Sequence, residues 1–183
     1  HKSLLGPQGI GGFLLTDEMA REIRPVITGG TGSVSDSEEQ PDFLPDKFES
    51  GTMNIPGIFG FHAALGYLEQ RGIENIRAHE LSLACAFIEK VKDIPGVRVV
   101  GPGPEEERAP VVSLDFTAGD NAEVAFILES QYGIMTRCGL HCAPNAHKTL
   151  KTFPQGTVRF TFGWANTMEE VEAAAGAVAK AAP

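Results

Sequence analysis

Lys2 is the first residue in this 183-residue sequence whose type and surroundings could support chemistry. It follows His1 and precedes a glycine-rich run that starts at Gly6. A lysine amine can form a Schiff base with a carbonyl compound when the amine is unprotonated and held in place, and nearby glycines let the backbone approach a phosphate. The alternative, which these residues favour when taken alone, is a surface lysine ahead of a turn.

A cluster of cysteine and histidine between Cys138 and His147 is a second candidate. A metal site is one interpretation, but the stretch has no C-x-x-C pair and no second half downstream. Another is a reactive thiol, Cys142, on a loop. A third is a cysteine that acts only as a small buried hydrophobic residue. The neighbours that could lower the pKa of the thiol are Arg137, His141, His147 and Lys148.

Arg159 is a third candidate, within the alternating run TVRFTF. The period of two predicts that Val158 and Phe160 face one way and Arg159 faces the other. An arginine on an otherwise apolar strand suits a carboxylate or phosphate, because its planar fork can make two parallel hydrogen bonds. A solvent-facing edge residue or an internal ion pair are the alternatives.

The segment from Glu49 to Asn54, ESGTMN, is a fourth candidate because it precedes a predicted helix. The hydroxyl of Thr52 and free N–H groups at a helix N-terminus could bind a phosphate. The alternative is that Thr52 or Asn54 simply caps the helix.

Several helices and strands must position these residues. Helical periodicity or capping signals predict helices at 17–22, 55–71, 76–91 and 120–131, and a last one from Thr167 to about Ala181. Short apolar or alternating runs predict strands at 97–100, 111–116, 134–137 and 157–163. Residues 9–15 predict a glycine-rich turn that leads into a buried strand. Residues 28–47 are rich in Gly, Ser, Asp and Pro and predict a long loop.

The order of these elements predicts two regions that meet near Gly72. Residues 73–183 alternate helices and strand pairs, which indicates a small α+β domain. Residues 1–72 form the other region. The sequence starts without Met and without a lead-in segment, so we expect it to begin inside a domain.

Composition narrows the possible partners. The net charge of -9 disfavours nucleic acids and anionic membranes, since polyanions would repel the chain. No apolar run is long enough to span a membrane. Three cysteines without a secretion signal favour reduced thiols in the cytoplasm.

Taken together, the four groups resemble the class V aminotransferase family of fold type I pyridoxal 5′-phosphate (PLP) enzymes. HKSLLGPQGIGG resembles the segment with the PLP lysine, and ESGTMNIPGI the family's E-x-GT-x-N segment. RCGLHCAPNAHKTL resembles the cysteine loop of group II cysteine desulfurases and selenocysteine lyases. VRFTFGWANTMEEVE resembles their terminal segment. The resemblance covers nearly the whole sequence and implies an α/β fold: the C-terminal part of the large PLP-binding domain (1–72) and a small α+β domain (73–183).

The resemblance also implies roles. Lys2 would hold PLP covalently, with His1 beside it, and Thr52 would contact the phosphate of a cofactor in the second subunit of a homodimer. Arg159 would bind the carboxylate of a small amino-acid substrate, and Arg137 would shape the cysteine loop. Cys142 would take sulfur from L-cysteine, leaving L-alanine, and pass it to an acceptor protein.

Two departures keep alternatives open. Cys138 stands where many relatives have a small or hydroxyl residue, and Leu140 where some desulfurases have a histidine. The alternatives are an aminotransferase or other PLP lyase that does not use Cys142, and a non-catalytic metal- or protein-binding module. We also expect the 183-residue chain by itself to hold PLP poorly and to show little or no activity.

Overall fold

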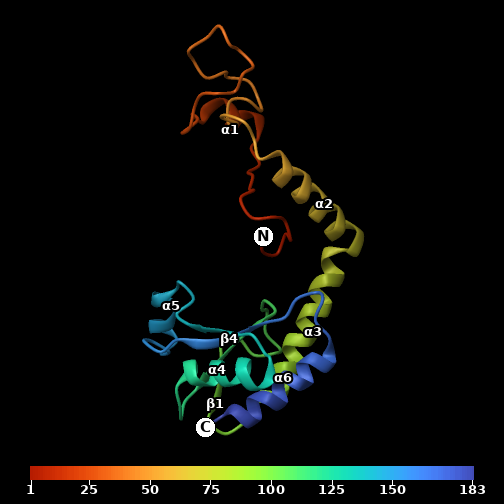
Figure 1. Cartoon of the computed structure of the whole chain (residues 1–183), viewed down its shortest axis with the longest axis vertical. Coiled ribbons are helices and arrows are strands. Elements are labelled where there is room, and N and C mark those ends of the chain that lie inside the picture. Colours follow the sequence, from red (N-terminus) through yellow and green to blue (C-terminus); the bar gives the residue numbers. More distant parts are fainter. The chain divides into compact units, whose positions relative to one another are not determined.

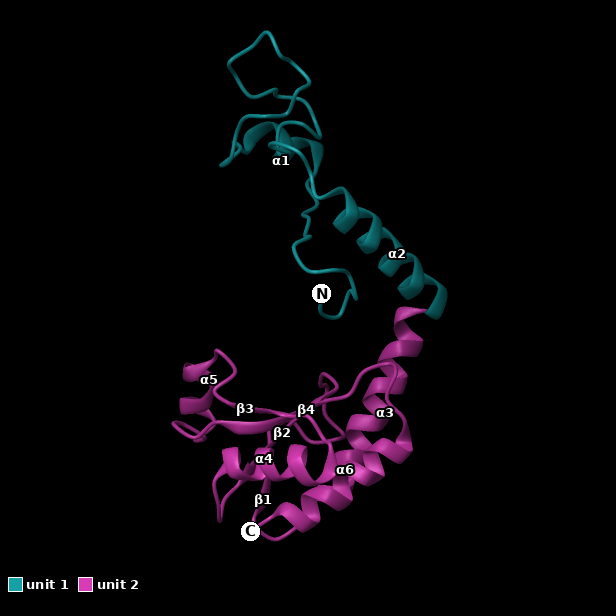
Figure 2. Cartoon of the chain, viewed as in Figure 1, with its two compact units in different colours: residues 1–71 teal, residues 72–183 magenta.

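The computed structural model describes all 183 residues and divides them into two compact units, His1–Arg71 and Gly72–Pro183 (Figure 2). We refer to them as unit 1 and unit 2. Unit 1 contains two helices, α1 (Asp17–Glu22) and α2 (Ile55–Arg71). Unit 2 contains the other elements (Figure 1), which are α3 (Ile73–Val91), β1 (Val97–Val100), β2 (Val111–Phe116), α4 (Asn121–Tyr132), β3 (Arg137–Gly139), α5 (Pro144–Thr149), β4 (Thr157–Thr161) and α6 (Met168–Ala181).

The four strands of unit 2 form one antiparallel sheet in the order β1-β2-β4-β3. Strand β4 is therefore interior, with β2 on one side and β3 on the other. Helices α3 and α4 contact the strands on one face of this sheet, and α6 packs against both of these helices, as Figure 2 shows. Along each strand, every second side chain points to the face that packs against the helices, and the side chains between them point to the opposite face.

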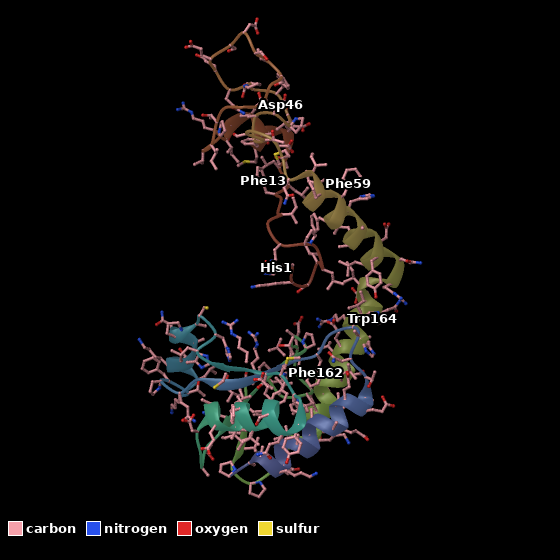
Figure 3. All side chains as sticks on the ribbon, viewed as in Figure 1. His1, Phe13, Asp46, Phe59, Phe162 and Trp164 are labelled. Carbon is pink, nitrogen blue, oxygen red and sulfur yellow. The ribbon has the colours of Figure 1, made fainter.

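The core of unit 2 lies between the sheet and these three helices. Alternate residues of β2 and β4, among them Leu114 and Val158, are fully buried there. Phe87 of α3 packs its ring 4.7 Å from that of Phe160 and 5.3 Å from that of Phe162, which is labelled in Figure 3. Aromatic rings at these separations stabilise a core beyond the area they bury. Unit 2 thus has a continuous apolar core.

Asn121, at the start of α4, fastens three segments of unit 2 together. Its Oδ1 accepts a hydrogen bond from the backbone N–H of Phe116 at 2.9 Å. Its Nδ2 donates to the carbonyl of Gly156 at 3.0 Å and to Asp115 Oδ1 at 3.1 Å. Because the side chain is fully buried, these bonds are shielded from water. They tie β2 and α4 to the turn that enters β4.

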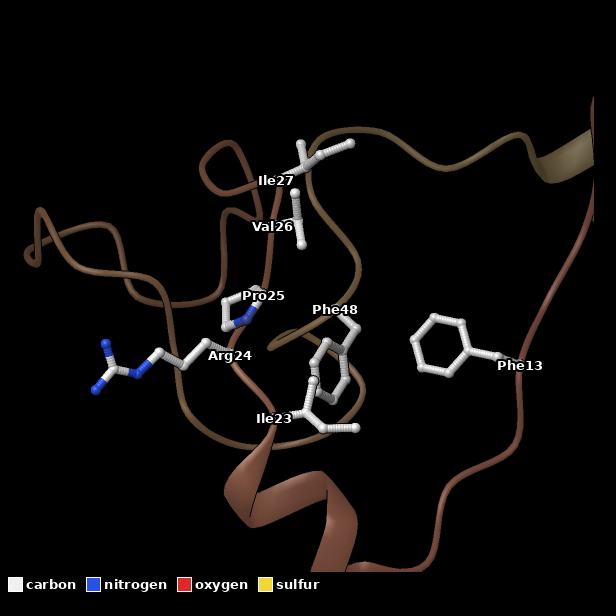
Figure 4. A pocket seen from close by; sticks show the side chains of 7 residues that line it. All are labelled: Phe13, Ile23, Arg24, Pro25, Val26, Ile27 and Phe48. Carbon is white, nitrogen blue, oxygen red and sulfur yellow. The ribbon is translucent and has the colours of Figure 1, made fainter.

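Unit 1 buries little apolar surface. Ala20 and Leu68 are its only buried hydrophobic side chains, whereas Leu14 is 100% exposed and Val26 98% exposed. Phe13 and Phe48 meet edge to face at 5.6 Å beside Ile23, in a hollow of about 270 Å³ from which Arg24 extends away (Figure 4). A unit with so few buried side chains has no core of its own.

Most predicted elements are confirmed. Helices α1 and α2 have the predicted bounds. Asp120 caps α4 by accepting from the N–H of Ala122, and Thr167 and Glu170 form the capping box of α6. The predicted alternation along β4 also holds, since Val158 and Phe160 are buried in the core.

Several details of the prediction are wrong, among them the end of β4, which lies at Thr161 rather than at residue 163. Residues 9–15 form no strand, because the segment has no neighbouring strand to pair with. Helix α3 begins at Ile73, three residues earlier than predicted, and β3 lies at Arg137–Gly139 rather than 134–137. Helix α5 was not predicted, since its six residues carry no apolar periodicity. No helix is both long and apolar enough to cross a membrane.

Candidate functional site

The face of the sheet opposite the helices carries two arginines directly across from each other. Arg159 of β4 is the register partner of Arg137 of β3 on one side and of Ser113 of β2 on the other. Like charges opposite each other on a sheet are destabilising unless something compensates them. The nearby carboxylate of Asp115 is already paired with Arg98 at 2.8 Å. The arrangement is typical of a site that binds an anion.

Arg159 is neither an edge residue nor a member of an ion pair. Strand β4 is interior to the sheet, and no carboxylate lies within ion-pair distance of the guanidinium. Its Nε is buried without a hydrogen-bond partner. Both structural alternatives for Arg159 are therefore wrong, and a buried donor without a partner is the kind of group a bound carboxylate would satisfy.

Cys142 lies on a tight turn that follows β3. The N–H of Ala143 donates to the carbonyl of Leu140 at 2.8 Å and closes the turn. Its two central residues, His141 and Cys142, have φ of 50° and 60°. Positive φ costs a residue other than glycine roughly 1–2 kcal/mol. Two such residues in succession are a strained arrangement that must be held by its surroundings.

Arg137 is the cation that contacts the Cys142 thiol. Its Nη2 donates to Cys142 Sγ at 3.9 Å, and the thiol is exposed. The other predicted neighbours are engaged elsewhere, since His147 Nδ1 bonds to Thr152 Oγ1 at 2.7 Å and Lys148 lies over the ring of Phe153. The thiol thus has open access to solvent and one guanidinium beside it.

His141 fixes the turn to the sheet. Its Nε2 lies 3.3 Å from Thr157 Oγ1, and its ring is 5.7 Å from that of His147. Burial lowers the pKa of His141, and the charges of Arg159, His147 and Arg137 lower it further. Its Nδ1 is buried without a partner. The ring is therefore uncharged at neutral pH, because its pKa lies below the ordinary 6.5.

Cys138 belongs to the opposite face. It is the register partner of Val158 and packs against the apolar core of unit 2. Burial raises the pKa of its thiol, and the charge of Asp120 raises it further, so Cys138 stays protonated and unreactive at neutral pH. Although the sequence places two thiols close together, they point to different faces of the sheet.

Lys2 and His1 lie on an exposed segment of unit 1. They line an open hollow of about 370 Å³ with Ser3 and Leu4, and His1 is labelled in Figure 3. No hydrogen bond or ion pair holds the amine of Lys2, although its carbonyl accepts from the N–H of Leu5 at 2.8 Å. The amine therefore has no competing partner within unit 1.

Thr52 precedes α2 and is exposed. The capping residue is Asn54, whose Oδ1 accepts from the N–H of Gly57 at 3.0 Å, while the N–H of Ile55 is bonded to the carbonyl of Met53. Pro56 has no N–H. The first positions of α2 therefore offer no free N–H groups, and the Thr52 hydroxyl is the group left for a phosphate. No hydrogen bond joins Thr52 to His1 or Lys2.

Unit 2 thus brings together Arg137, Cys142 and Arg159 on one face, and His141 and Thr157 with them. The sequence did not single out Thr157, although alternation along β4 places it on the same face as Arg159 and could have drawn attention to it. No group of three or more His, Cys, Asp or Glu side chains could hold a metal ion.

Comparison with protein families gives a match to the class V aminotransferases over residues 1–174. The chain belongs to this family. Its members are PLP-dependent enzymes, so the α/β fold, the family and the cofactor expected from the sequence are confirmed.

The individual relatives that match the chain are called cysteine desulfurases. A probable cysteine desulfurase of Methanothermobacter thermautotrophicus is 34% identical over 176 residues, which are 94% of this chain and 43% of the relative. The apo structure of a cysteine desulfurase from Thermococcus onnurineus NA1 matches all of this chain and 45% of its own, with a TM-score of 0.89 and 32% identity. The cysteine desulfurase CsdA of Escherichia coli matches 97% of this chain and 43% of its own, with a TM-score of 0.84 and 29% identity. The chain spans less than half the length of these relatives.

Proposed function

We propose that this chain works in a PLP-dependent cysteine desulfurase, which converts L-cysteine to L-alanine and receives the sulfur on Cys142. The observation that carries the proposal is the arrangement on the face of the unit 2 sheet that lies opposite the helices. An exposed thiol on a strained turn lies against Arg137, and Arg159 has a buried donor without a partner. The Cys142 thiol could act as a nucleophile, and the Arg159 guanidinium could bind the carboxylate of an amino acid.

The residues of unit 1 fit PLP as the cofactor. The amine of Lys2 has no competing partner, and the Thr52 hydroxyl is exposed and can donate to a phosphate. We assign covalent attachment to Lys2, a place beside the cofactor to His1, and a phosphate contact to Thr52 in the second subunit of a homodimer. When bound, PLP supplies an electron sink that stabilises negative charge on the carbon atoms of the substrate.

The chain's own residues would carry out the sulfur transfer. Arg159 binds and orients the substrate carboxylate, and Arg137 holds the Cys142 thiol in place. The Cys142 thiolate forms a bond to the substrate sulfur as the bond between that sulfur and Cβ breaks, leaving its electron pair on Cβ. A proton delivered to Cβ then gives alanine, and the sulfur remains on Cys142 as a persulfide for an acceptor protein.

The remaining features of the proposal concern assembly and location. We propose that residues 1–72 belong to a large PLP-binding domain and residues 73–183 form the small domain. The large exposed side chains of unit 1, such as Leu14 and Val26, support the view that the assembled homodimer covers this unit. Three free cysteines support a reducing, cytoplasmic location.

Replacing Cys142 in the full-length enzyme tests the proposal. With PLP and L-cysteine, Cys142→Ala should lower the rate of alanine formation by about 100-fold or more, as expected for loss of a nucleophile. Cys138→Ala is the matched control and should keep the rate, because its side chain faces the core. Unchanged alanine formation by Cys142→Ala, together with amino transfer to a keto acid, would instead assign a different PLP reaction.

A further inference from the structure

We propose that His141 is a positioning residue for the thiol, because its bond to Thr157 Oγ1 holds the Leu140–Ala143 turn so that Cys142 stays against Arg137. The inference rests on the proposed role of Cys142 and adds a residue that acts through it. His141 neither contacts the thiol nor supplies charge to it. It determines where the backbone that carries the thiol lies.

The turn needs such an anchor because its backbone is strained. Both central residues have positive φ, a conformation that glycine adopts readily and that strains a residue with a Cβ. Within the turn, the hydrogen bond from Ala143 to Leu140 provides closure, but one such bond does not fix the turn relative to the sheet. Strained residues persist where surrounding contacts hold them.

Thr157 is a rigid anchor point. It is 1% exposed and is the first residue of β4. The preceding Gly156 lies so close to Gly139 of β3 that an added Cβ would be 2.2 Å from the Gly139 carbonyl, and Asn121 binds the Gly156 carbonyl. The backbone that carries the Thr157 hydroxyl is therefore held by both β3 and α4.

The charge state of His141 agrees with a structural bond. Burial lowers the pKa of the ring, and the side chains that face it, Arg159 of β4, His147 of α5 and Arg137 of β3, lower it further. A neutral imidazole has one ring nitrogen that donates and one that accepts, so it can either donate to the Thr157 hydroxyl or accept from it. A charged ring here would add a third cation to the arginine pair.

The test measures how close Cys142 stays to the positive charge of Arg137. Alkylation rates of Cys142 in the 183-residue chain are measured with iodoacetate, an anion, and with iodoacetamide, which is neutral, by peptide mass spectrometry. The rate with iodoacetate divided by the rate with iodoacetamide reports the charge near the thiol, and the measurement needs no cofactor. Arg137→Gln should lower this ratio about threefold to fivefold, the effect of one unit charge a few ångströms away in water.

Loss of the anchor should have the same effect. Thr157→Val keeps the shape but removes the hydroxyl, and it should lower the ratio about as much as Arg137→Gln. The double variant should show no further fall, because both changes remove the same interaction. Thr157→Ser restores the hydroxyl and should restore the ratio. His141→Phe removes the other partner of this hydrogen bond. It replaces Thr157→Val in the test if that buried variant does not fold.

Two results would overturn the inference. One is an unchanged ratio in both Thr157→Val and His141→Phe while Arg137→Gln lowers it, because the thiol would then stay in place without the bond. The other is an unchanged ratio in Arg137→Gln. Because the measurement needs neither PLP nor turnover, the positioning role can fail while Cys142→Ala still abolishes desulfuration, and the reverse can also occur.

Discussion

Replacing Asn121 with alanine removes a fully buried side chain that makes three hydrogen bonds and leaves its partners in place. The N–H of Phe116 and the carbonyl of Gly156 both lose their side-chain partner. Both residues are buried, so water cannot replace the missing bonds. Asp115 loses one bond but keeps its ion pair with Arg98.

The expected cost follows from these three losses. A buried backbone group left without a partner costs about 1–3 kcal/mol, and the bond to Asp115 adds about 1 kcal/mol. We therefore expect the free energy of unfolding of unit 2 to fall by about 3–7 kcal/mol, a large part of the stability of an ordinary domain of about 5–15 kcal/mol.

Urea unfolding of the 183-residue chain measures this cost, with the fluorescence of Trp164 as the signal. Trp164 is the only tryptophan of the chain and lies in unit 2. The matched control is Asn145→Ala, which changes an exposed asparagine of α5 and should alter the unfolding free energy by less than about 0.5 kcal/mol. A loss below about 1 kcal/mol in Asn121→Ala would refute the reasoning, since such a value is too small for even two unpaired buried groups.

Two further outcomes follow from backbone geometry and from charge. Gly156→Ala should lower the unfolding free energy by more than about 1 kcal/mol, because φ is 78° and the new Cβ would lie 2.2 Å from Gly139. Gly176→Ala in α6 is the control: its Cβ would meet nothing within 4 Å, and it should raise the unfolding free energy by about 0.5–1 kcal/mol. Urea unfolding measures both variants. His141 has a folded pKa below its unfolded value of 6.5, so the unfolded state binds more protons, and stability should decrease as the pH falls below about 6.5 toward the lowered pKa. Unfolding curves between about pH 5 and pH 8 check this. The pH dependence should be weaker in His141→Gln, and an identical dependence in both proteins would contradict the charge assignment.

Local signals in the sequence were enough for most elements of unit 2. The Thr167 and Glu170 capping box is a short-range arrangement of a hydroxyl, a carboxylate and two N–H groups, so it depends little on the rest of the chain. The same holds for the cap of α4 at Asp120. The period of two along β4 predicted the buried positions correctly, because alternation follows from strand geometry.

Local signals failed where burial depends on a neighbour. The run at 9–15 has the composition of a buried strand, yet Leu14 is 100% exposed because no strand lies beside it. Helix α5 has no apolar periodicity and begins with Pro144, so only its place between β3 and β4 defines it. The bounds of β3 shifted because strand ends are set by pairing with β4.

The sequence by itself determined the residue types of the candidate site and the strand face on which Arg159 lies, since alternation is a local property of the backbone. Only the tertiary structure decided that Arg137 is its direct partner, that β4 is interior to the sheet, and that His141 meets Thr157. These facts depend on strand order and on a turn with positive φ, which join residues distant in sequence. No local pattern encodes that pairing, because the order of strands is fixed by how their apolar faces pack on shared helices.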